Sequence, residues 1–382
     1  VTASFSKLSE EFFSIFTHKT LPFLSEHGWD DCYGGLFESL NTKGEHGRED
    51  FRRVMLHGRQ LFVFSRWAGL TDNENFKAMA NKIFEYMTNS FWDREYGGWY
   101  SRVAIDGYPA DSTKDLYAHA FVLFGLIHHA RYVEKQKSEH WIEKTLSVLA
   151  QHFLRTDGSY KEKMNRYFAD ETINQRYQNP HMHLFEAALA LCEYKKTSEN
   201  SSFAMSLLAL FKNKFLDQKN MIIREFLDKK FNPDNKIGHV IEPGHHYEWA
   251  WLLSWAAETL ERSELNGLGK SILDRSLKFG WDSAHNGVFD QVNARDFSVW
   301  KNSKRLWPVL ELIKALNVFL DNKNRIYLGK ALEILMTYYF KKDGTWTEHY
   351  SFDWKVLSDG MPVSSAYHLG MASLVLNNLN DS

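Results

Sequence analysis

The sequence has few of the features of disulfide-bonded, membrane-spanning or polyanion-binding proteins. Only two of its 382 residues are cysteine, Cys32 and Cys192, too few for a disulfide framework or a thiolate zinc site, which fits a reducing cytosol. No stretch approaches the ~20 apolar residues of a membrane span, and no signal peptide is recognisable. With 46 Lys and Arg against 48 Asp and Glu, no basic field attracts nucleic acid or anionic lipid. We therefore expect a cytoplasmic protein with neither as a partner.

Aromatic residues, in contrast, are abundant, at 15% of the chain. Many of them must fill a core, but aromatic rings in a concave site also stack on the apolar faces of sugars. The 25% of charged and 44% of apolar residues are ordinary for a folded globular protein and exclude a disordered chain. At ~150 residues per domain, the length allows two or three domains or one large barrel.

A hairpin-like segment recurs along the chain. The clearest copies combine an aromatic residue, Asp, a glycine-containing turn and alternating apolar and polar residues, a pattern typical of short β-hairpins. They are GWDDCYGGLFESL from Gly28, FWDREYGGWYSRV from Phe91 and GWDSAHNGVFDQV from Gly280. Weaker copies begin at Phe153, Phe215 and Phe340, which makes six copies at intervals of roughly sixty residues.

Between the hairpins, apolar residues recur with the period of a helix. The segments after each hairpin are apolar nearly all round, as an inner ring requires: Phe51–Leu70, Ser112–Arg131, Asn179–Tyr194, Pro243–Leu260, Ser303–Leu320 and Pro362–Leu379. Those before each hairpin are more amphipathic, as in an outer ring: Phe5–Glu26, Asn73–Phe91, Glu139–Phe153, Ser202–Phe215, Leu268–Phe279 and Arg325–Phe340. Six antiparallel pairs predict an all-α (α/α)6 barrel, a single domain over residues 1–382 with the β-hairpins on one face.

Each expected inner helix carries one polar or aromatic residue at an equivalent position. These residues are again spaced by roughly sixty residues, and they are Arg59, Tyr117, His183, His245, Trp307 and His368. Equivalent positions of equivalent helices lie at one level of a barrel, so we expect these side chains to converge on its axis. Such a group of imidazole, guanidinium and aromatic groups predicts a polar ligand site.

Several of these residues also have a purely structural interpretation. An isolated inward histidine such as His183 is often a hydrogen-bonded core residue, and Trp307 is compatible with core packing. His245 follows Pro-Gly at a helix start, where the dipole disfavours its imidazolium while Glu248, three residues on, favours it, which would hold its pKa near neutrality. We expect Arg59 to pair with a carboxylate, with Glu311 and a ligand oxygen as candidate partners. The neighbouring histidines His57, His181, His246 and His349 are assigned to structure or to the rim of the site.

No metal or nucleotide cofactor is expected. His181 and His183 are two residues apart on a helix and face different ways, and the chain has no H-E-x-x-H motif. It also lacks the G-x-G-x-x-G and G-x-S-x-G patterns of dinucleotide-binding proteins and serine hydrolases.

The segments PGHHYEW, NPHMHLFEA, LWPVLE and YHL resemble the N-acylglucosamine 2-epimerase superfamily, which includes cellobiose 2-epimerases and mannose and sulfoquinovose isomerases. The resemblance covers the whole chain and implies an (α/α)6 barrel that opens a free sugar and moves a proton at C2 through an enediolate, without a metal. By position it implies an acid–base pair of His245 and His368, supported by Glu248 and Glu311, with Arg59 holding substrate oxygens. It places Tyr117, Asn179, His183 and Trp307 in the pocket wall.

The resemblance also favours one branch of the superfamily. The motif H-x-x-E-W, in which Trp249 follows Glu248, resembles that of the isomerases more than that of the epimerases. Ser364 stands where a sulfoquinovose-type isomerase has Gln, and residues 232–239 contain only Lys236 as a base. These features favour an unmodified sugar. The expected reaction is therefore the interconversion of D-mannose, or related sugars such as lyxose, with D-fructose through a cis-enediolate.

Other functions stay open at this point. One histidine serving both C1 and C2 gives isomerisation, whereas two on opposite faces of C2 give 2-epimerisation of mannose, glucose or N-acetylmannosamine. An inverting glycoside hydrolase on the same barrel would need two carboxylates, recruited from Asp93, Asp115, Asp170 and Glu248. A non-catalytic sugar-binding protein is a further alternative, and the sequence leaves monomer and homodimer equally open.

Overall fold

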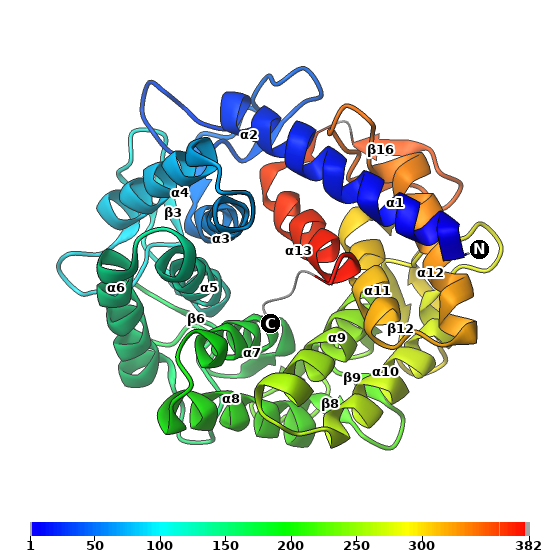
Figure 1. Cartoon of the computed structure of the whole chain (residues 1–382). Coiled ribbons are helices and arrows are strands. Elements are labelled where there is room, and N and C mark those ends of the chain that lie inside the picture. The colour runs from blue at the N-terminus through cyan, green and yellow to red at the C-terminus, as the bar shows by residue number, and fades with distance from the viewer. Residues whose placement is uncertain (1, 359, 379–382) are drawn as a thin grey trace.

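The computed structural model describes residues 2–358 and 360–378. An inner ring of helices surrounds the barrel axis (Figure 1), and it consists of α3 (Val54–Thr71), α5 (Leu116–Tyr132), α7 (Gln178–Tyr194), α9 (Pro243–Thr259), α11 (Leu306–Val318) and α13 (Ala366–Leu376). Each of these helices packs on the next, and α13 closes the ring against α3. Their side chains are buried almost all round, which confirms the inner ring expected from their apolar sequences.

The outer ring packs on the inner one pair by pair. It consists of α1 (Thr2–Ile15) with α2 (Leu21–His27), α4 (Glu74–Tyr86), α6 (Lys135–Val148), α8 (Ser198–Leu210), α10 (Glu264–Gly280) and α12 (Asn322–Ile334). Short π-helical turns at Phe16–Thr20, Met87–Phe91, Leu149–Phe153, Phe211–Phe215 and Leu335–Tyr339 follow α1, α4, α6, α8 and α12. The expected (α/α)6 barrel is confirmed. None of the described helices is long and apolar enough to cross a bilayer.

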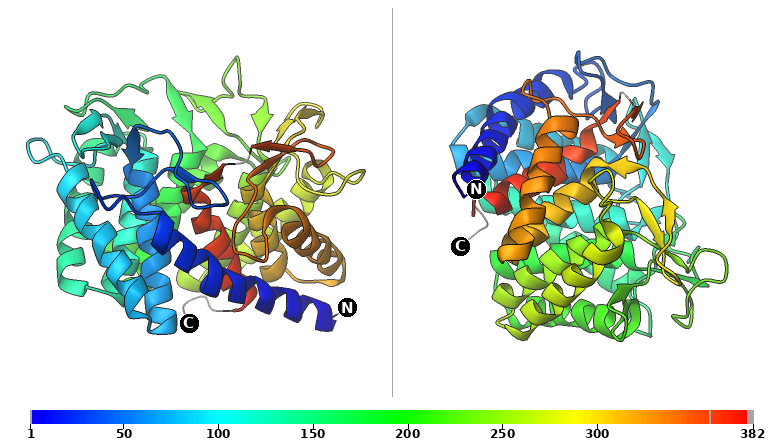
Figure 2. Two further views of the ribbon diagram at one scale, coloured as in Figure 1. Left: turned by 90° about the horizontal axis from the view of Figure 1, so that it is seen from above. Right: turned by 90° about the vertical axis from the view of Figure 1, so that its right-hand side faces the viewer.

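All the strands lie at the end of the barrel opposite the chain termini (Figure 2, left). They are β1 (Ser39–Leu40), β2 (Phe51–Arg53), β3 (Arg102–Ala104), β4 (Pro109–Asp111), β5 (Lys114–Asp115), β6 (Lys163–Met164), β7 (Gln175–Tyr177), β8 (Leu216–Asp217), β9 (Ile222–Ile223), β10 (Phe226–Asp228), β11 (Val240–Ile241), β12 (Gln291–Asn293), β13 (Val299–Lys301), β14 (Lys304–Arg305), β15 (His349–Tyr350), β16 (Val356–Ser358) and β17 (Met361–Pro362). The expectation that the hairpins share one face is confirmed.

Antiparallel pairing joins successive repeats at this end. A strand just before an inner helix pairs with the next repeat in β2–β3, β5–β6, β7–β10, β11–β12 and β14–β15. The last pair closes the ring, because β17 lies against β1 with Pro362 opposite Ser39. Pro362 therefore belongs to a strand, and a 3-10 turn over Val363–Ser365 separates it from α13, which corrects the expected helix start at Pro362. The expected end of that helix, Leu379, lies outside the described residues.

Four buried histidines hold the hairpins against the inner helices. Each accepts a hydrogen bond at Nε2 from a hairpin N–H and bonds through Nδ1 to the carbonyl four residues earlier. We term them the clamp histidines: His57, His119, His181 and His246. Because the N–H can only donate and the carbonyl only accept, each ring must be neutral with its proton on Nδ1. The structural role expected for His57, His181 and His246 is confirmed, whereas His119 was not foreseen.

The predicted helix boundaries are otherwise displaced by a few residues. Phe51–Arg53 and Lys114–Asp115 are strands, so α3 and α5 begin later than their apolar pattern indicated. The first outer helix is interrupted by the π turn at Phe16–Thr20. Much of the aromatic content fills the core, where Trp67, Trp99 and the indole of Trp249 are fully or almost fully buried.

Candidate active site

All six ring positions line one cavity of about 450 Å³. The cavity lies at the strand end of the inner ring, and its wall includes Arg59, Tyr117, His183, His245, Trp307 and His368. The convergence expected from their spacing is confirmed. Asn179 and Glu248 also line the cavity, whereas Glu311 lies behind the wall, fully buried.

Three histidines of the wall each bond through Nδ1 to a buried carboxylate. The distances are 3.0 Å from His183 to Glu186, 2.9 Å from His245 to Glu225 and 2.8 Å from His368 to Glu311. We term these three the cavity histidines. A carboxylate that accepts from Nδ1–H fixes the tautomer and leaves Nε2 for a ligand. The cavity histidines are thus built differently from the clamp histidines, whose ring nitrogens both bond to backbone.

His245 is held by a buried relay of side chains. The indole N–H of Trp249 donates to Gln178 Oε1 at 2.8 Å, and Gln178 Nε2 donates to Glu225 at 2.6 Å. Glu225 then accepts from His245 Nδ1–H. Trp249 can only donate, so it sets the orientation of the Gln178 amide and directs its N–H group at the Glu225 carboxylate.

Carboxylates decide the charge of His245. Burial by itself lowers the pKa of this imidazole, but the Glu225 carboxylate and then Glu242, whose Oε2 lies 4.0 Å away, outweigh burial and raise the pKa to about 9. His245 is therefore an imidazolium at neutral pH. One expectation is corrected here: the pKa of His245 lies above neutrality and not near it. Glu248 does favour the charged ring, as expected, but Glu225 and Glu242 contribute more.

His368 has the opposite protonation state. Burial lowers its pKa to about 4, although Glu311 favours the charged ring, and Arg59 and Lys314 lower the pKa further. The Nζ atom of Lys314 lies 2.6 Å from the second oxygen of Glu311, so the carboxylate behind His368 is already paired with a cation. At neutral pH the cavity thus contains one charged and one neutral imidazole. The ring of Trp307 is close to both, with its centroid 5.0 Å from that of His245 and 5.9 Å from that of His368.

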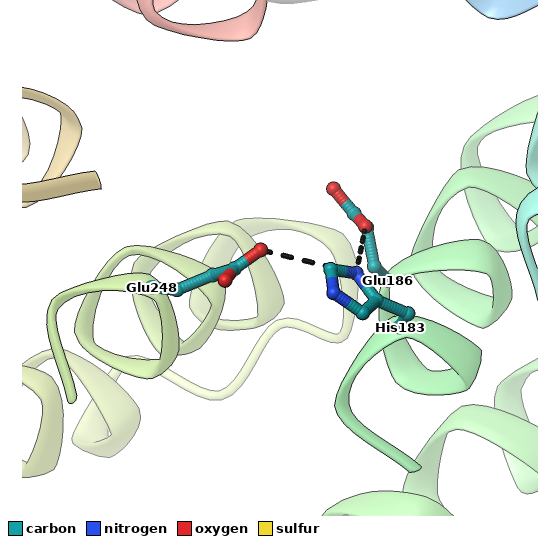
Figure 3. A group of neighbouring side chains, drawn as sticks. All are labelled: His183, Glu186 and Glu248. Atoms are coloured by element: carbon teal, nitrogen blue, oxygen red, sulfur yellow. Dashed lines mark hydrogen bonds and ion pairs between the residues drawn. The ribbon is translucent and has the colours of Figure 1, made fainter. Parts of the chain in front are cut away.

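His183, Glu186 and Glu248 form a tight buried cluster between α7 and α9 (Figure 3). One potential ligand atom from each lies within 4.8 Å of the others, a spacing that could hold a cation. However, Nδ1 of His183 is hydrogen-bonded to Glu186, which also accepts from the Tyr367 hydroxyl. Burial, and then the nearby Glu311 carboxylate, raise the pKa of Glu248 well above its usual range. Hydrogen bonds thus fix His183 and Glu186, whereas Glu248 Oε1 lies 3.8 Å from His183 Nδ1 and is without a hydrogen-bond partner among the described residues. We assign no metal to the cluster.

Arg59 contacts aromatic groups instead of a carboxylate. Its guanidinium donates to the Tyr117 hydroxyl at 2.7 Å and lies 4.2 Å from the ring centroid of Phe121 and 5.0 Å from that of Tyr367. Among the described residues, no carboxylate is within ion-pair distance of it. The expected pairing with Glu311 is therefore wrong, because Glu311 is taken by His368 and Lys314. A cation without a protein counterion is available to the oxygens of a ligand.

Several cavity residues were not anticipated from the sequence, among them Arg53, Glu242, Arg305 and Glu348. Glu348 bonds to the Ser365 hydroxyl, and burial raises its pKa to about 7. Glu348 belongs to a second set of equivalent positions, which lies in the second arm of the hairpins and comprises Glu38, Glu162, Glu225, Asp290 and Glu348. Glu38, Glu162 and Glu225 each accept from the backbone N–H just before an inner helix. Aligning the hairpins residue by residue would have singled out Glu225.

The carboxylates proposed for a hydrolase do not meet in the cavity. Asp93 is bound by Lys114 and Arg166, and Asp170 by Arg155. Asp115 accepts from the Ala118 N–H at the start of α5. Of the four candidates, only Glu248 lines the cavity.

Comparison with known proteins gives the class of this barrel. The model of the N-acylglucosamine 2-epimerase (GlcNAc 2-epimerase) family matches residues 35–372, and the chain belongs to this family. A mannose-6-phosphate isomerase of Rhizobium meliloti (strain 1021) is 28% identical over 373 residues, covering 91% of each chain. A cellobiose 2-epimerase of Dictyoglomus turgidum is 25% identical over 343 residues, covering 86% of this chain and 85% of that protein.

A solved structure shares the fold along the whole chain. A D-mannose isomerase superposes with a TM-score of 0.86 over 99% of this chain and 98% of that one, at 19% identity. The family and these relatives confirm that the protein is an enzyme, a sugar epimerase or isomerase.

Proposed function

We propose that the protein interconverts D-mannose, or related free monosaccharides such as lyxose, with D-fructose through a cis-enediolate. The main support is the pair of oppositely protonated histidines, His245 and His368, which both lie next to Trp307. Moving a proton next to a carbonyl requires a base that is neutral and an acid that is charged at the working pH.

The proposed steps use these two groups in sequence. With the sugar ring open, Nε2 of neutral His368 takes the proton from C2, and the C–H electron pair forms the C1=C2 bond of the enediolate. The carbonyl oxygen at C1 receives a proton from the His245 imidazolium as its double bond becomes single. His368 then returns a proton to C1, and His245 takes back the hydroxyl proton at C2, which leaves a ketone there.

The remaining cavity residues are proposed to hold the substrate. Arg59 carries a charge without a protein counterion and would bind the oxygens that become negative in the enediolate. Trp307 offers a ring face for the sugar. Tyr117, Asn179, His183 and Glu248 supply hydrogen bonds to hydroxyl groups, and Glu311 orients His368.

We propose that this chemistry needs neither metal nor other cofactor, because the acid and the base are both imidazoles. Excess EDTA should leave turnover unchanged, and loss of activity that Mg²⁺ or Zn²⁺ restores would contradict this. A cytoplasmic location is also proposed, in keeping with free Cys32 and Cys192. Whether the enzyme is a monomer or a homodimer can be measured by light scattering.

A 2-epimerase is the second candidate. It is favoured by the placement of the two histidines on different helices, α9 and α13, so that each could serve one face of C2. Incubation with D-mannose in D₂O, followed by NMR, separates the two outcomes. Fructose carrying deuterium at C1 supports the isomerase, glucose carrying deuterium at C2 supports the epimerase, and unchanged mannose contradicts both for this sugar.

A further inference from the structure

Lys314 is a buried cation that the proposed mechanism does not use. Its side chain is fully buried on α11, with Nζ 2.6 Å from Glu311 Oε2 and 3.7 Å from the ring centroid of Trp251. It does not line the cavity. A buried charge is costly to desolvate, and the mere filling of space would be served as well by an apolar side chain.

The carboxylates that hold His245 and His368 differ in whether such a cation is paired with them. Each ring is buried and bonds through Nδ1 to one carboxylate. Behind His245, Glu225 bonds to the neutral amide of Gln178, and the carboxylate of Glu242 adds further negative charge. Behind His368, the single carboxylate has Lys314 on its other oxygen.

Other charged groups that face His368 come from several elements. Arg59 of α3 lies on the cavity side and opposes a charge on this ring. Glu348, which precedes β15, bonds to Ser365 near the start of α13. Across the cavity, Glu186 of α7 and Glu248 of α9 act on the adjacent Tyr367. Of the two cations, only Lys314 touches the carboxylate that holds His368.

We propose that Lys314 is a positioning residue that favours one direction of proton transfer: by pairing with Glu311, it weakens the pull of that carboxylate on a second proton and so helps burial and Arg59 to keep His368 the base, with His245 as the acid. The carboxylate can then orient the ring through Nδ1–H without drawing a second proton onto it. Without Lys314, both imidazoles would be backed by carboxylates that have no cation beside them, and the two pKa values would lie closer together. The inference rests on the proposed function only where it names His368 as the base.

The direct test is an NMR titration of the His368 ring in K314M, without sugar. The wild-type, K314M, K314R and E311Q/K314M proteins are compared, and H368Q assigns the resonance. An uncompensated carboxylate at this distance raises a pKa by about one to three units. We therefore expect the pKa of His368 to rise by about one unit or more in K314M. It should stay near the wild-type value in K314R and fall back in E311Q/K314M, where both charges are gone.

Kinetic measurements show whether Lys314 changes the pKa of His368 or only packs against its neighbours. In K314M, the acidic limb of the pH profile of kcat/KM should move to higher pH by a similar amount, whereas a packing role would lower kcat/KM at every pH and leave the limb in place. An unchanged His368 titration in folded K314M overturns the proposal. If K314M does not fold, E311Q/K314M is compared with E311Q, and the protein that retains Lys314 should have the lower pKa at His368. A shifted titration in a protein that does not convert mannose would refute the proposed function and leave this inference standing.

Discussion

The clamp histidines and the cavity histidines lie almost side by side in the chain but have opposite environments. His245 and His246 are adjacent, and His181 and His183 are two residues apart. The clamp ring of His246 bonds to the carbonyl of Glu242 and to the N–H of Ile223, and burial lowers its pKa to about 3. Its neighbour bonds to a carboxylate and is charged. The partner of a buried imidazole, more than its burial, decides whether it can transfer protons.

The largest expected effect is the loss of turnover when His245, but not its neighbour His246, is replaced by alanine. H245A removes a proposed proton-transfer group and should lower kcat by about 10²-fold or more while the protein stays folded. H368A should do the same. H246A should lower the melting temperature but leave kcat of the folded fraction close to normal. Steady-state kinetics on mannose with circular dichroism tests this, and near-normal turnover in a folded H245A/H368A protein would contradict the mechanism.

Substitution of a clamp histidine should lower the free energy of unfolding. H119Q loses bonds to the Trp99 N–H and the Asp115 carbonyl, and leaving buried groups unpaired should cost about 2 kcal/mol in the free energy of unfolding. Denaturant unfolding measures this. H140Q, an exposed histidine on α6, is the matched control and should have almost no effect.

The same clamp should give the stability a characteristic pH dependence. Burial lowers the pKa of His119 from 6.5 to about 3, so the unfolded chain takes up this proton first as the pH falls. The stability contributed by the neutral ring is complete above about pH 6.5 and is lost progressively toward about pH 3. H119Q should therefore lose less stability than the wild type over this range. An equal loss in both proteins would contradict the assigned tautomer.

Substrate-holding residues should show a smaller and different effect. R59A and W307A should each raise KM by about tenfold, because a charge-assisted hydrogen bond or a stacked ring to the bound sugar is lost. R59A should lower kcat as well, because its charge is also lost from the enediolate oxygens. W307A should retain the pH profile of the wild type, whereas R59A should move the acidic limb to higher pH, because Arg59 lowers the pKa of His368. A fall in kcat with unchanged KM would place these residues in the chemical step instead.

The smallest expected change is a shift of the basic limb in the pH profile of kcat/KM. E225Q keeps the shape behind His245 but removes the charge, so the pKa of His245 should fall by about one unit or more and take the basic limb of kcat/KM with it. Glu162 is the equivalent carboxylate of another repeat and does not line the cavity. E162Q should leave the basic limb in place. A basic limb that is insensitive to E225Q would show that Glu225 does not charge His245.

Much of this architecture could be predicted because it depends on local periodicity. The recurring hairpins give the register of the inner helices, and that register brings Arg59, His245 and His368 to one level, as the cavity confirms. Helix ends were less predictable, because β2 and β5 form only when the neighbouring repeat offers a strand to pair with.

The partners of the cavity residues could be decided only by the tertiary structure. Glu225 reaches His245 from a hairpin, and Glu311 reaches His368 from the neighbouring helix, whereas Glu248, three residues from His245, contributes to a different cluster. Arg59 lies against aromatic rings where the sequence suggested a carboxylate. The physical reason is that helix and hairpin patterns are set by neighbours along the chain. The charge of a buried group, in contrast, is set by through-space contacts a few ångströms long, and a chain of six repeats can make those contacts in several ways.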